Sequence, residues 1–435
     1  MACAAALRGV RVSAQPEGGP ALPSTAPAEE RDRRLNRAIR PLLVQYVLAF
    51  TGYLSLTPVL AVLVRDGWHQ SGLVVGLALM VFSCSSRAGS IVLSPWLEGR
   101  SGVRVLLLAN LLSGSCFLTM SVAHSVLPLI VLLAAGGTGV SLNGLVVRSV
   151  VAEWTSGSPA QVTAFAKLNV MLNLAAAVGP LIGTAVLDTD APWRLMVVIA
   201  AGYYAAALSM LFVVRKEGKG FERGGKRFSL RQYWTALRSS PFLRHVVLVS
   251  TVGWVLYAQM YSALPLYLFA TAGSKLQVAT YFTMSALIIV VLQIPASKGV
   301  ARLMEAHGVA LTTVIGTGMG CFAAAFAVLA LSGGNPVATY AAVATFTLGE
   351  ILFAPSVDTA FAKSRDKSTG SFVAVYTGKQ FTLATGEGLG MLLGGGFFEY
   401  VRGVFSPTVY WAAFAAAGAV AAAGTVLRRV RMPSV

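Results

Sequence analysis

Charged residues are scarce in this sequence of 435 residues: Asp, Glu, Lys and Arg make up 12% of it, against about 25% in a typical soluble protein. Hydrophobic residues make up 56%. A chain of this composition, folded in water, would have too few charges on its surface to stay soluble. The shortage of charge therefore excludes an ordinary soluble enzyme.

Cysteine and histidine are also scarce, with four residues of each. Cys84, Cys116 and Cys321 fall within apolar stretches and Cys3 lies near the start, without the paired spacing of a metal site or a disulfide framework. The sequence also lacks the glycine-rich phosphate loop of ATP-driven proteins. We therefore expect no metal and no cofactor, and a protein that is not an enzyme.

The sequence instead contains many long apolar stretches. Twelve of them recur between residues 40 and 428, each long enough to cross ~30 Å of hydrocarbon as a helix. Their continuous apolar character favours helices over the alternating pattern of barrel strands. We expect transmembrane helices near 40–64, 71–95, 104–122, 126–150, 162–187, 194–214, 243–270, 275–300, 308–331, 336–361, 370–397 and 405–428.

The two halves of the chain repeat one another, which predicts an all-α membrane protein of two pseudo-symmetric six-helix bundles. Ser55 aligns with Ser262 and Gly183 with Gly394, at similar offsets. Parallel repeats of this kind are used by transporters that alternate access between the two sides of a membrane. We expect a disordered cytoplasmic tail over 1–39, bundles over 40–214 and 243–428, a basic cytoplasmic linker with an amphipathic helix over 215–242, and a cytoplasmic tail over 429–435.

Positive charge exceeds negative charge, with 34 Lys and Arg against 17 Asp and Glu. Such an excess could serve nucleic acid or a membrane surface. With the N-terminus placed in the cytoplasm, 27 of the 34 basic residues fall in cytoplasmic segments and four in outer loops. This is the distribution of the positive-inside rule. The charge therefore predicts membrane topology, with both termini cytoplasmic and no nucleic acid as partner.

The loop after the second predicted span resembles a motif of the major facilitator superfamily. That motif usually reads Gly-x-x-x-Asp-Arg-x-Gly-Arg-Arg. Aligned on Gly102, the chain keeps Arg100 and Arg104, and Glu98 stands one residue before the position of the family's acid. The resemblance implies that these four residues form a gate loop on the cytoplasmic side.

The fifth predicted span resembles the antiporter motif of the same family, Gly-x-x-x-Gly-Pro-x-x-Gly-Gly. Gly179, Pro180 and Gly183 match it, with Ala175 and Thr184 as small replacements. Glycine allows close helix approach and proline interrupts the backbone hydrogen bonds, so tight packing alone is the alternative interpretation. The resemblance is strongest to bacterial drug:proton antiporters, although their acid in the first span and their arginine motif in the fourth are missing.

Charges inside the spans are the sharpest functional signal, because each costs at least ~2.5 kcal/mol near the membrane centre. Glu350 falls close to the middle of the tenth span, with Asp358 and Glu387 as further acids. We expect one of these carboxyl groups to carry a proton, Glu350 first, since removal from water favours the neutral form. Arg87 and Lys379 are the matching intramembrane cations, for an ion pair or an anionic group of the substrate.

Polar and aromatic residues at span depth are candidates for a substrate cavity. In the family resembled here, spans one, four, seven and ten line that cavity. Hydrogen bonds between helices are the alternative explanation for each of these residues. The candidates are Tyr46, Tyr53, Asn143, Tyr257, Gln259 and Tyr261.

The sequence thus predicts a secondary transporter in a bacterial inner membrane that exports a small amphipathic compound or drug in exchange for protons. The alternative is a proton-coupled importer or facilitator of a small nutrient, and the remote alternative is a membrane sensor that transports nothing. The expected partners are a small-molecule substrate, protons and membrane lipids, and we expect a monomer.

Overall fold

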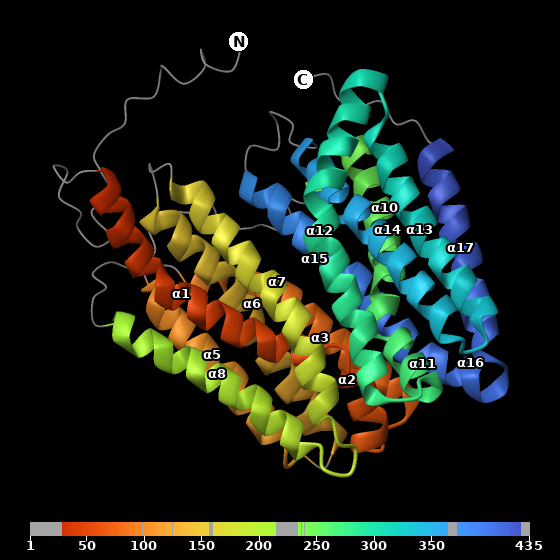
Figure 1. Cartoon of the computed structure of the whole chain (residues 1–435), viewed down its shortest axis with the longest axis horizontal. Coiled ribbons are helices and arrows are strands. Elements are labelled where there is room, and N and C mark those ends of the chain that lie inside the picture. Colours follow the sequence, from red (N-terminus) through yellow and green to blue (C-terminus); the bar gives the residue numbers. More distant parts are fainter. Residues whose placement is uncertain are drawn as a thin grey trace.

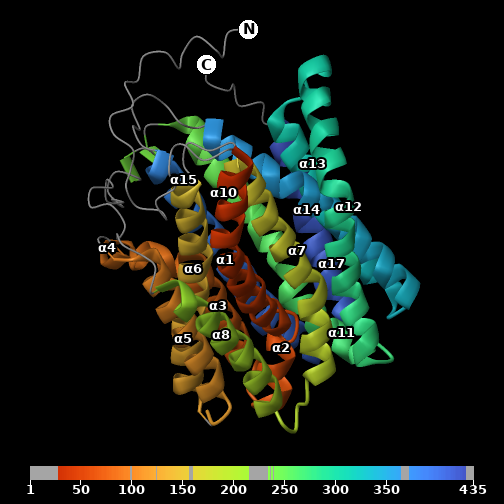
Figure 2. The same ribbon diagram turned by 60° about the vertical axis from the view of Figure 1, so that its left-hand side comes forward.

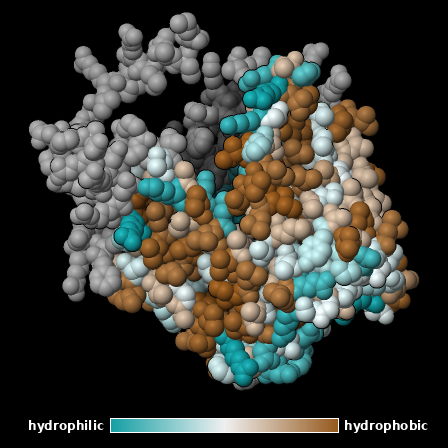
Figure 3. All heavy atoms as spheres, viewed as in Figure 1, coloured by the Kyte–Doolittle hydropathy of each residue, from teal (hydrophilic) through white to brown (hydrophobic). Residues whose placement is uncertain are grey.

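The computed structural model describes residues 28–97, 100–123, 125–155, 160–214, 234–235, 237–238, 240–363 and 372–427. In these residues all regular structure is helical (Figures 1 and 2). Eleven helices are long and apolar enough to cross a membrane, and Figure 3 shows hydrophobic side chains over much of their visible face. α15, the remaining long helix, is less apolar because it contains Lys379, Gln380 and Glu387. The predicted all-α membrane fold is confirmed.

Six long helices make up the first half of the chain and six the second, with short helical pieces between them. The first half contains α1 (Ala28–Leu56), α2 (Leu60–Val62), the π-helix η1 (Leu63–Gly67), α3 (Gly72–Val92), α4 (Ser94–Leu97), α5 (Gly102–Met120), α6 (Val126–Trp154), α7 (Ala160–Val186) and α8 (Trp193–Val214). The second contains α10 (Pro241–Tyr257), the 3-10 helix η2 (Ala258–Tyr261), α11 (Ala263–Thr271), α12 (Lys275–His307), α13 (Leu311–Ser332), α14 (Pro336–Lys363), α15 (Phe372–Leu392), the π-helix η3 (Leu393–Phe397), α16 (Phe398–Val404) and α17 (Pro407–Leu427).

The internal repeat appears as two equivalent contacts. In the first half, a Cβ added at Gly183 of α7 would collide with the Ser55 carbonyl of α1. In the second half, a Cβ added at Gly394, just after α15, would collide with the Ser262 side chain, beside the η2 break. Each glycine therefore lets a helix lie directly against the first helix of its own half. The alignment of Ser55 with Ser262 and of Gly183 with Gly394 is reproduced in space.

Two predicted boundaries differ from the structure. α1 begins at Ala28, within the predicted tail. α1 ends at Leu56 rather than near residue 64, since Pro58 cannot donate a backbone hydrogen bond. Residues 1–27, most of the predicted amphipathic linker helix, and 429–435 lie outside the described residues.

The two halves meet along two helix pairs, α3 with α15 and α7 with α12. We call the end of the molecule where α1 begins and α17 ends the terminal end, and the opposite end the loop end. In Figure 1 the halves converge at the loop end and diverge toward the terminal end, where Figure 3 shows a notch between them. Among the described residues, the halves are therefore packed together at the loop end and lie apart at the terminal end.

Backbone contact and ion pairing close the loop end. A Cβ added at Gly76 of α3 would lie 2.6 Å from Leu392 O, and one added at Gly395 of η3 would lie 2.6 Å from the Gly76 Cα. Nearby, Arg65 Nη1 lies 2.9 Å from Glu399 Oε1 across the boundary between the halves. On the other helix pair, the Lys275 ammonium donates a 2.5 Å hydrogen bond to the carbonyl oxygen of Leu187. These contacts define the loop-end seam.

Replacing Gly183 by valine tests the close packing of α7 on α1. The new side chain would overlap the Ser55 carbonyl, and overpacking costs about 1–3 kcal/mol. We therefore expect a lower melting temperature in detergent solution. Gly299→Val in α12 is the matched control, because a Cβ there meets nothing within 4 Å. Equal melting temperatures for the two variants would contradict the packing described.

Candidate functional site

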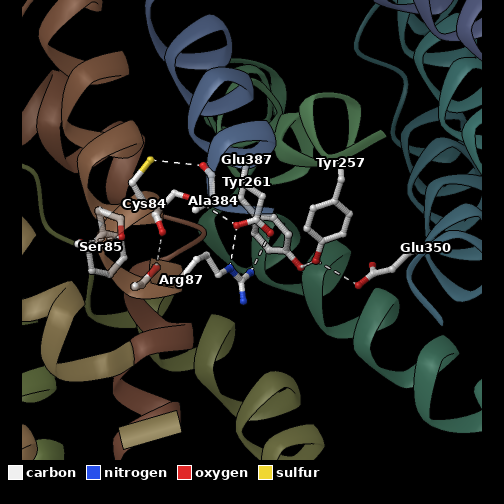
Figure 4. A network of polar contacts seen from close by, with 11 residues as sticks. Cys84, Ser85, Arg87, Tyr257, Tyr261, Glu350, Ala384 and Glu387 are labelled. Carbon is white, nitrogen blue, oxygen red and sulfur yellow. Dashed lines mark hydrogen bonds and ion pairs between the residues drawn. The ribbon is translucent and has the colours of Figure 1, made fainter. Parts of the chain in front are cut away.

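The candidate site lies between the halves, where the seam ends and the opening toward the terminal end begins. Its polar side chains come from α3 and α15 on one side and from α10, η2 and α14 on the other (Figure 4). Glycine brings the first two helices together: a Cβ at Gly388 of α15 would lie 2.5 Å from the Cys84 Sγ of α3. The Cys84 thiol donates to the carbonyl of Ala384 over 3.3 Å. This close approach positions the ion pair next to it.

Arg87 and Glu387 form a two-pronged ion pair between the halves. Arg87 Nε lies 2.8 Å from Glu387 Oε2, and Arg87 Nη2 lies 2.9 Å from Glu387 Oε1. One turn earlier on α3, the Ser83 hydroxyl donates to Glu387 Oε2 over 3.1 Å. Bidentate geometry and a third donor are what a charge removed from water needs to remain ionised.

The two partners are buried to different extents. The Glu387 side chain keeps 3% of its surface exposed, whereas Arg87 keeps 35%. Two of the three guanidinium nitrogens face Glu387, and Figure 4 shows the third, Nη1, pointing away from the carboxylate. The cation is therefore the accessible partner of the pair, and the carboxylate is the hidden one.

Glu350 of α14 forms a second polar cluster with two tyrosines. The Tyr257 hydroxyl donates to Glu350 Oε1 over 3.1 Å and lies 3.5 Å from the Tyr261 hydroxyl. Glu350 Oε2 is buried and has no hydrogen-bond partner among the described residues. No cation pairs with this carboxyl group in the described part of the chain. Burial with one oxygen unpaired penalises the ionised form of such a group.

Asp358 and Lys379, also predicted as intramembrane charges, lie nearer the terminal end and pair with each other. Asp358 Oδ1 is 2.5 Å from Lys379 Nζ, with the Asp358 side chain 55% exposed. Both belong to the second half, on α14 and α15. The structure thus separates the five predicted charges into two ion pairs and Glu350.

Among the six predicted cavity residues, Tyr257 and Tyr261 lie beside Glu350, and Tyr53 is half-buried. Tyr53 packs on Phe82, with ring centroids 5.8 Å apart. Its hydroxyl is within electrostatic reach of Arg87. Three members of the predicted set therefore converge on the two polar clusters, one from α1 and two from α10 and η2.

The other three predicted cavity residues are engaged in packing. Tyr46 is 1% exposed in the core of the first half. Asn143 Nδ2 donates to Asn110 Oδ1 over 2.6 Å and to Gln45 Oε1 over 3.0 Å, in a buried amide cluster. Gln259 Nε2 donates to Gly390 O over 3.1 Å, and Gln259 Oε1 accepts from the Tyr410 hydroxyl. These bonds join η2 to α15 and α17.

The predicted gate loop is described in part. Gly102 is buried at the start of α5, and Arg104 is exposed. Arg100 lies over the Trp96 ring, 4.1 Å from its centroid, and donates to the Trp96 carbonyl. Glu98 lies outside the described residues. The contacts of Arg100 with Trp96 lie within the first half.

The predicted antiporter motif packs within the first half. A Cβ at Gly179 would lie 2.8 Å from the Leu54 Cβ of α1, and Gly183 abuts Ser55. Pro180 lies inside α7, and its carbonyl accepts a 2.8 Å hydrogen bond from the Thr184 hydroxyl. The motif residues thus set the spacing of α7 and α1.

Sequence reasoning missed several contributors to the contacts between the halves, among them Ser83 and Glu399. Ser83 is four residues before Arg87, so it shares a helix face with it, and this spacing was a usable signal. Glu399, which pairs with Arg65 and with Arg402, lies 334 residues from Arg65 along the chain. No local pattern reveals that partnership.

The unequal burial of the ion pair predicts unequal costs of removing its members. Arg87→Gln would leave the hidden Glu387 carboxylate without its cation, which costs about 3–5 kcal/mol. Glu387→Gln should cost less, because the freed guanidinium is partly exposed. The double variant should be more stable than Arg87→Gln alone. Denaturant unfolding in detergent measures the free energy of unfolding of the three variants. A double variant less stable than Arg87→Gln would contradict the prediction.

Comparisons with known proteins agree with this architecture. The family model described as Major Facilitator Superfamily matches residues 42–384. A POT family transporter in complex with a thioalcohol-conjugated peptide is 12% identical, with a TM-score of 0.74, over 90% of this chain and 96% of that one. A sulfate-bound variant of a POT peptide transporter is 15% identical, with a TM-score of 0.72, over 90% and 94%.

A variant of the nucleoside transporter NupG is 12% identical, with a TM-score of 0.70, over 89% of this chain and 98% of that one. A search of curated protein sequences finds no significant match. At identities of 12–15%, the likeness to these structures shows a shared fold alone. The family model shows the family, because it matches most of the chain. The chain therefore belongs to the Major Facilitator Superfamily, as a multi-pass membrane transporter of small molecules and not an enzyme.

Proposed function

We propose that the protein is a proton-coupled transporter that takes up a small polar solute. The observation that carries this proposal is Glu350, a carboxyl group at the site between the halves. It is held by the Tyr257 hydroxyl on one oxygen, and its other oxygen is buried without a partner in the described structure. Such a group binds a proton readily when the site is closed to water and releases it when water enters.

The direction is proposed from the solutes named for similar structures and from the chemistry of the site. Similar structures are described as a peptide transporter and a nucleoside transporter, and both kinds of solute are polar. Arg87, Glu350 and tyrosine hydroxyls suit hydrogen bonding to such a solute better than they suit a mainly apolar drug. Export is the second candidate, supported by the partial antiporter motif at Gly179, Pro180 and Gly183 of α7.

The orientation follows from the distribution of basic residues. The positive-inside rule assigns the terminal end to the cytoplasm, so the described conformation would open inward with its loop-end seam facing out. Transport then requires the seam to open and the terminal end to close around the site, as rocking of the two halves provides. Glu350 would bind a proton when the solute enters the site from outside. It would release this proton when the solute leaves the site on the inside.

Glu350→Gln tests the proton site in proteoliposomes. With an acidic outer solution, the wild type should accumulate members of a panel of dipeptides and nucleosides. The variant should lose this accumulation and keep exchange down a solute gradient, because a neutral amide cannot cycle a proton. A pH-sensitive dye inside the vesicles reports whether protons enter with the solute.

Glu305→Gln is the matched control, since Glu305 is exposed near the end of α12. Gradient-driven accumulation by Glu350→Gln at the wild-type level would place the proton site elsewhere. Efflux of solute from loaded vesicles coupled to proton entry would favour the export candidate over uptake.

A further inference from the structure

We infer that Tyr261 is the group through which a proton on Glu350 controls solute binding, by way of a chain of hydrogen bonds whose direction the proton reverses. The chain runs from Glu350 through the Tyr257 hydroxyl to the Tyr261 hydroxyl. This role rests on the proposed function and specifies the solute of the same site: one that presents a hydrogen-bond acceptor, such as a carbonyl or hydroxyl oxygen, to Tyr261.

The three groups lie in a row between α14, α10 and η2. The Tyr257 hydroxyl is 3.1 Å from Glu350 Oε1 and 3.5 Å from the Tyr261 hydroxyl. Figure 4 shows the row leading from Glu350 toward the ion pair of Arg87 and Glu387. The Tyr257 side chain is buried, whereas Tyr261 is half-buried. Tyr257 is therefore the enclosed middle of the chain, and Tyr261 is its partly exposed end.

The single hydrogen of each hydroxyl fixes the direction of the chain. A tyrosine hydroxyl has one hydrogen to donate, so Tyr257 cannot donate to Glu350 and to Tyr261 at once. Ionised Glu350 can only accept, and a charged acceptor forms the stronger hydrogen bond. It therefore takes the Tyr257 hydrogen. Tyr261 then donates to the Tyr257 oxygen, and the lone pairs of Tyr261 are what it presents to the site.

The unequal surroundings of the two carboxyl oxygens decide where an added proton acts. Glu350 Oε2 is buried without a hydrogen-bond partner among the described residues. A proton on Oε2 would be a buried donor with nothing to bind, which costs free energy. A proton on Oε1 instead faces the Tyr257 oxygen, which can accept it. The carboxyl group is thus arranged to pass its change of state to Tyr257.

A proton on Glu350 Oε1 reverses every bond of the chain. The neutral acid donates to the Tyr257 oxygen, Tyr257 donates to the Tyr261 oxygen, and Tyr261 turns its own hydrogen toward the site. The added proton stays on Glu350, and each hydroxyl only rotates about its C–O bond, so no other bond forms or breaks covalently. Tyr261 therefore presents an acceptor when Glu350 is ionised and a donor when Glu350 is neutral.

This change of character couples the solute to the proton. A solute oxygen accepts a hydrogen bond from Tyr261 in the protonated form and meets the lone pairs of Tyr261 in the ionised form. The solute and the proton therefore strengthen each other's binding, because a coupling free energy acts equally in both directions. A solute with only an N–H group at this point would favour the ionised form and would compete with the proton.

Charged and titratable side chains of other helices surround the chain. Those within electrostatic reach of Glu350 or Tyr261 are Glu387 of α15, Arg87 of α3 and Tyr53 of α1. α13 contains no charged residue, and the charged residues of α12 are Lys275 and those from Lys298 onward. Among the described residues, Tyr257 is the one side chain that hydrogen-bonds the Glu350 carboxyl group. The proton therefore acts first on Tyr257.

Infrared difference spectroscopy of the full chain in detergent tests the reversal without a solute. On lowering the pH, a carboxyl C=O band that is missing from Glu350→Gln reports the proton on Glu350. The C–O stretch of tyrosine differs between a donating and an accepting hydroxyl, so the same pH step should change it in the wild type. Tyr257→Phe should keep the carboxyl band and lose the tyrosine change, because the middle of the chain is gone.

Tyr267→Phe is the matched control for loss of a buried tyrosine hydroxyl. The Tyr267 hydroxyl lies 2.8 Å from the Ser332 hydroxyl in the same half and is not part of the chain from Glu350. This variant should therefore keep both the carboxyl band and the tyrosine change of the wild type.

Exchange of uridine and of alanyl-alanine by proteoliposomes, with equal pH on both sides, gives a second readout. In the wild type, KM should be about two- to tenfold lower at acidic than at alkaline pH, the effect of one hydrogen bond. Tyr261→Phe should raise the acidic KM by that factor and remove its pH dependence. The maximal rate of exchange should be retained, since the site keeps its shape.

Two spectroscopic results would overturn the inference and leave Glu350 as the proton site: a carboxyl band without a tyrosine change, or an equal tyrosine change in Tyr257→Phe. A KM that keeps its pH dependence in Tyr261→Phe would overturn the role of Tyr261. If no carboxyl band from Glu350 appears, the proposed function and this inference fail together. The expected bands without gradient-driven uptake would count against the proposed function alone.

Discussion

The ion pair between Arg87 and Glu387 is the interaction on which the arrangement of the two halves depends. A charge at mid-membrane is costly unless a partner and further hydrogen bonds replace water, and here each half supplies one partner. The Glu387 carboxylate is buried and accepts a hydrogen bond from Ser83, whereas the Arg87 side chain is partly exposed. The pair therefore stabilises contact between α3 and α15 while keeping one of its charges within reach of the site.

Glycine makes that contact possible. Gly76, Gly388 and Gly395 bring the α3 and α15–η3 backbones so close that a single added carbon would overlap a neighbour. Within each half, Gly183 and Gly394 do the same for the first helix of the repeat. Close approach at glycine thus serves both the contacts between the halves and the contacts within each half. Between α3 and α15 it is combined with the ion pair of Arg87 and Glu387.

Local and periodic features of the sequence predicted the fold, because span length, positive charge distribution and the repeat are all readable along one chain. The same reading placed Glu350, Tyr257 and Tyr261 in one set of candidate cavity residues, and the structure brings these three side chains together. It could not choose a partner for Arg87 between Glu350 and other charges, since depth alone does not give the rotation of a helix. Asn143 and Gln259 looked like cavity residues because polarity at span depth is the same whether a side chain faces the cavity or a neighbouring helix.

The loop-end seam ends in charges rather than in apolar side chains. Arg65, Glu399 and Arg402 lie at the rim, with the Arg65 and Glu399 side chains 16% and 14% exposed. Because Glu399 pairs both with Arg65 of the first half and with Arg402 of its own half, separating the halves at this end breaks one of its ion pairs and leaves the other. Glu399 therefore keeps a cation as partner in either case, which lowers the cost of breaking the pair with Arg65.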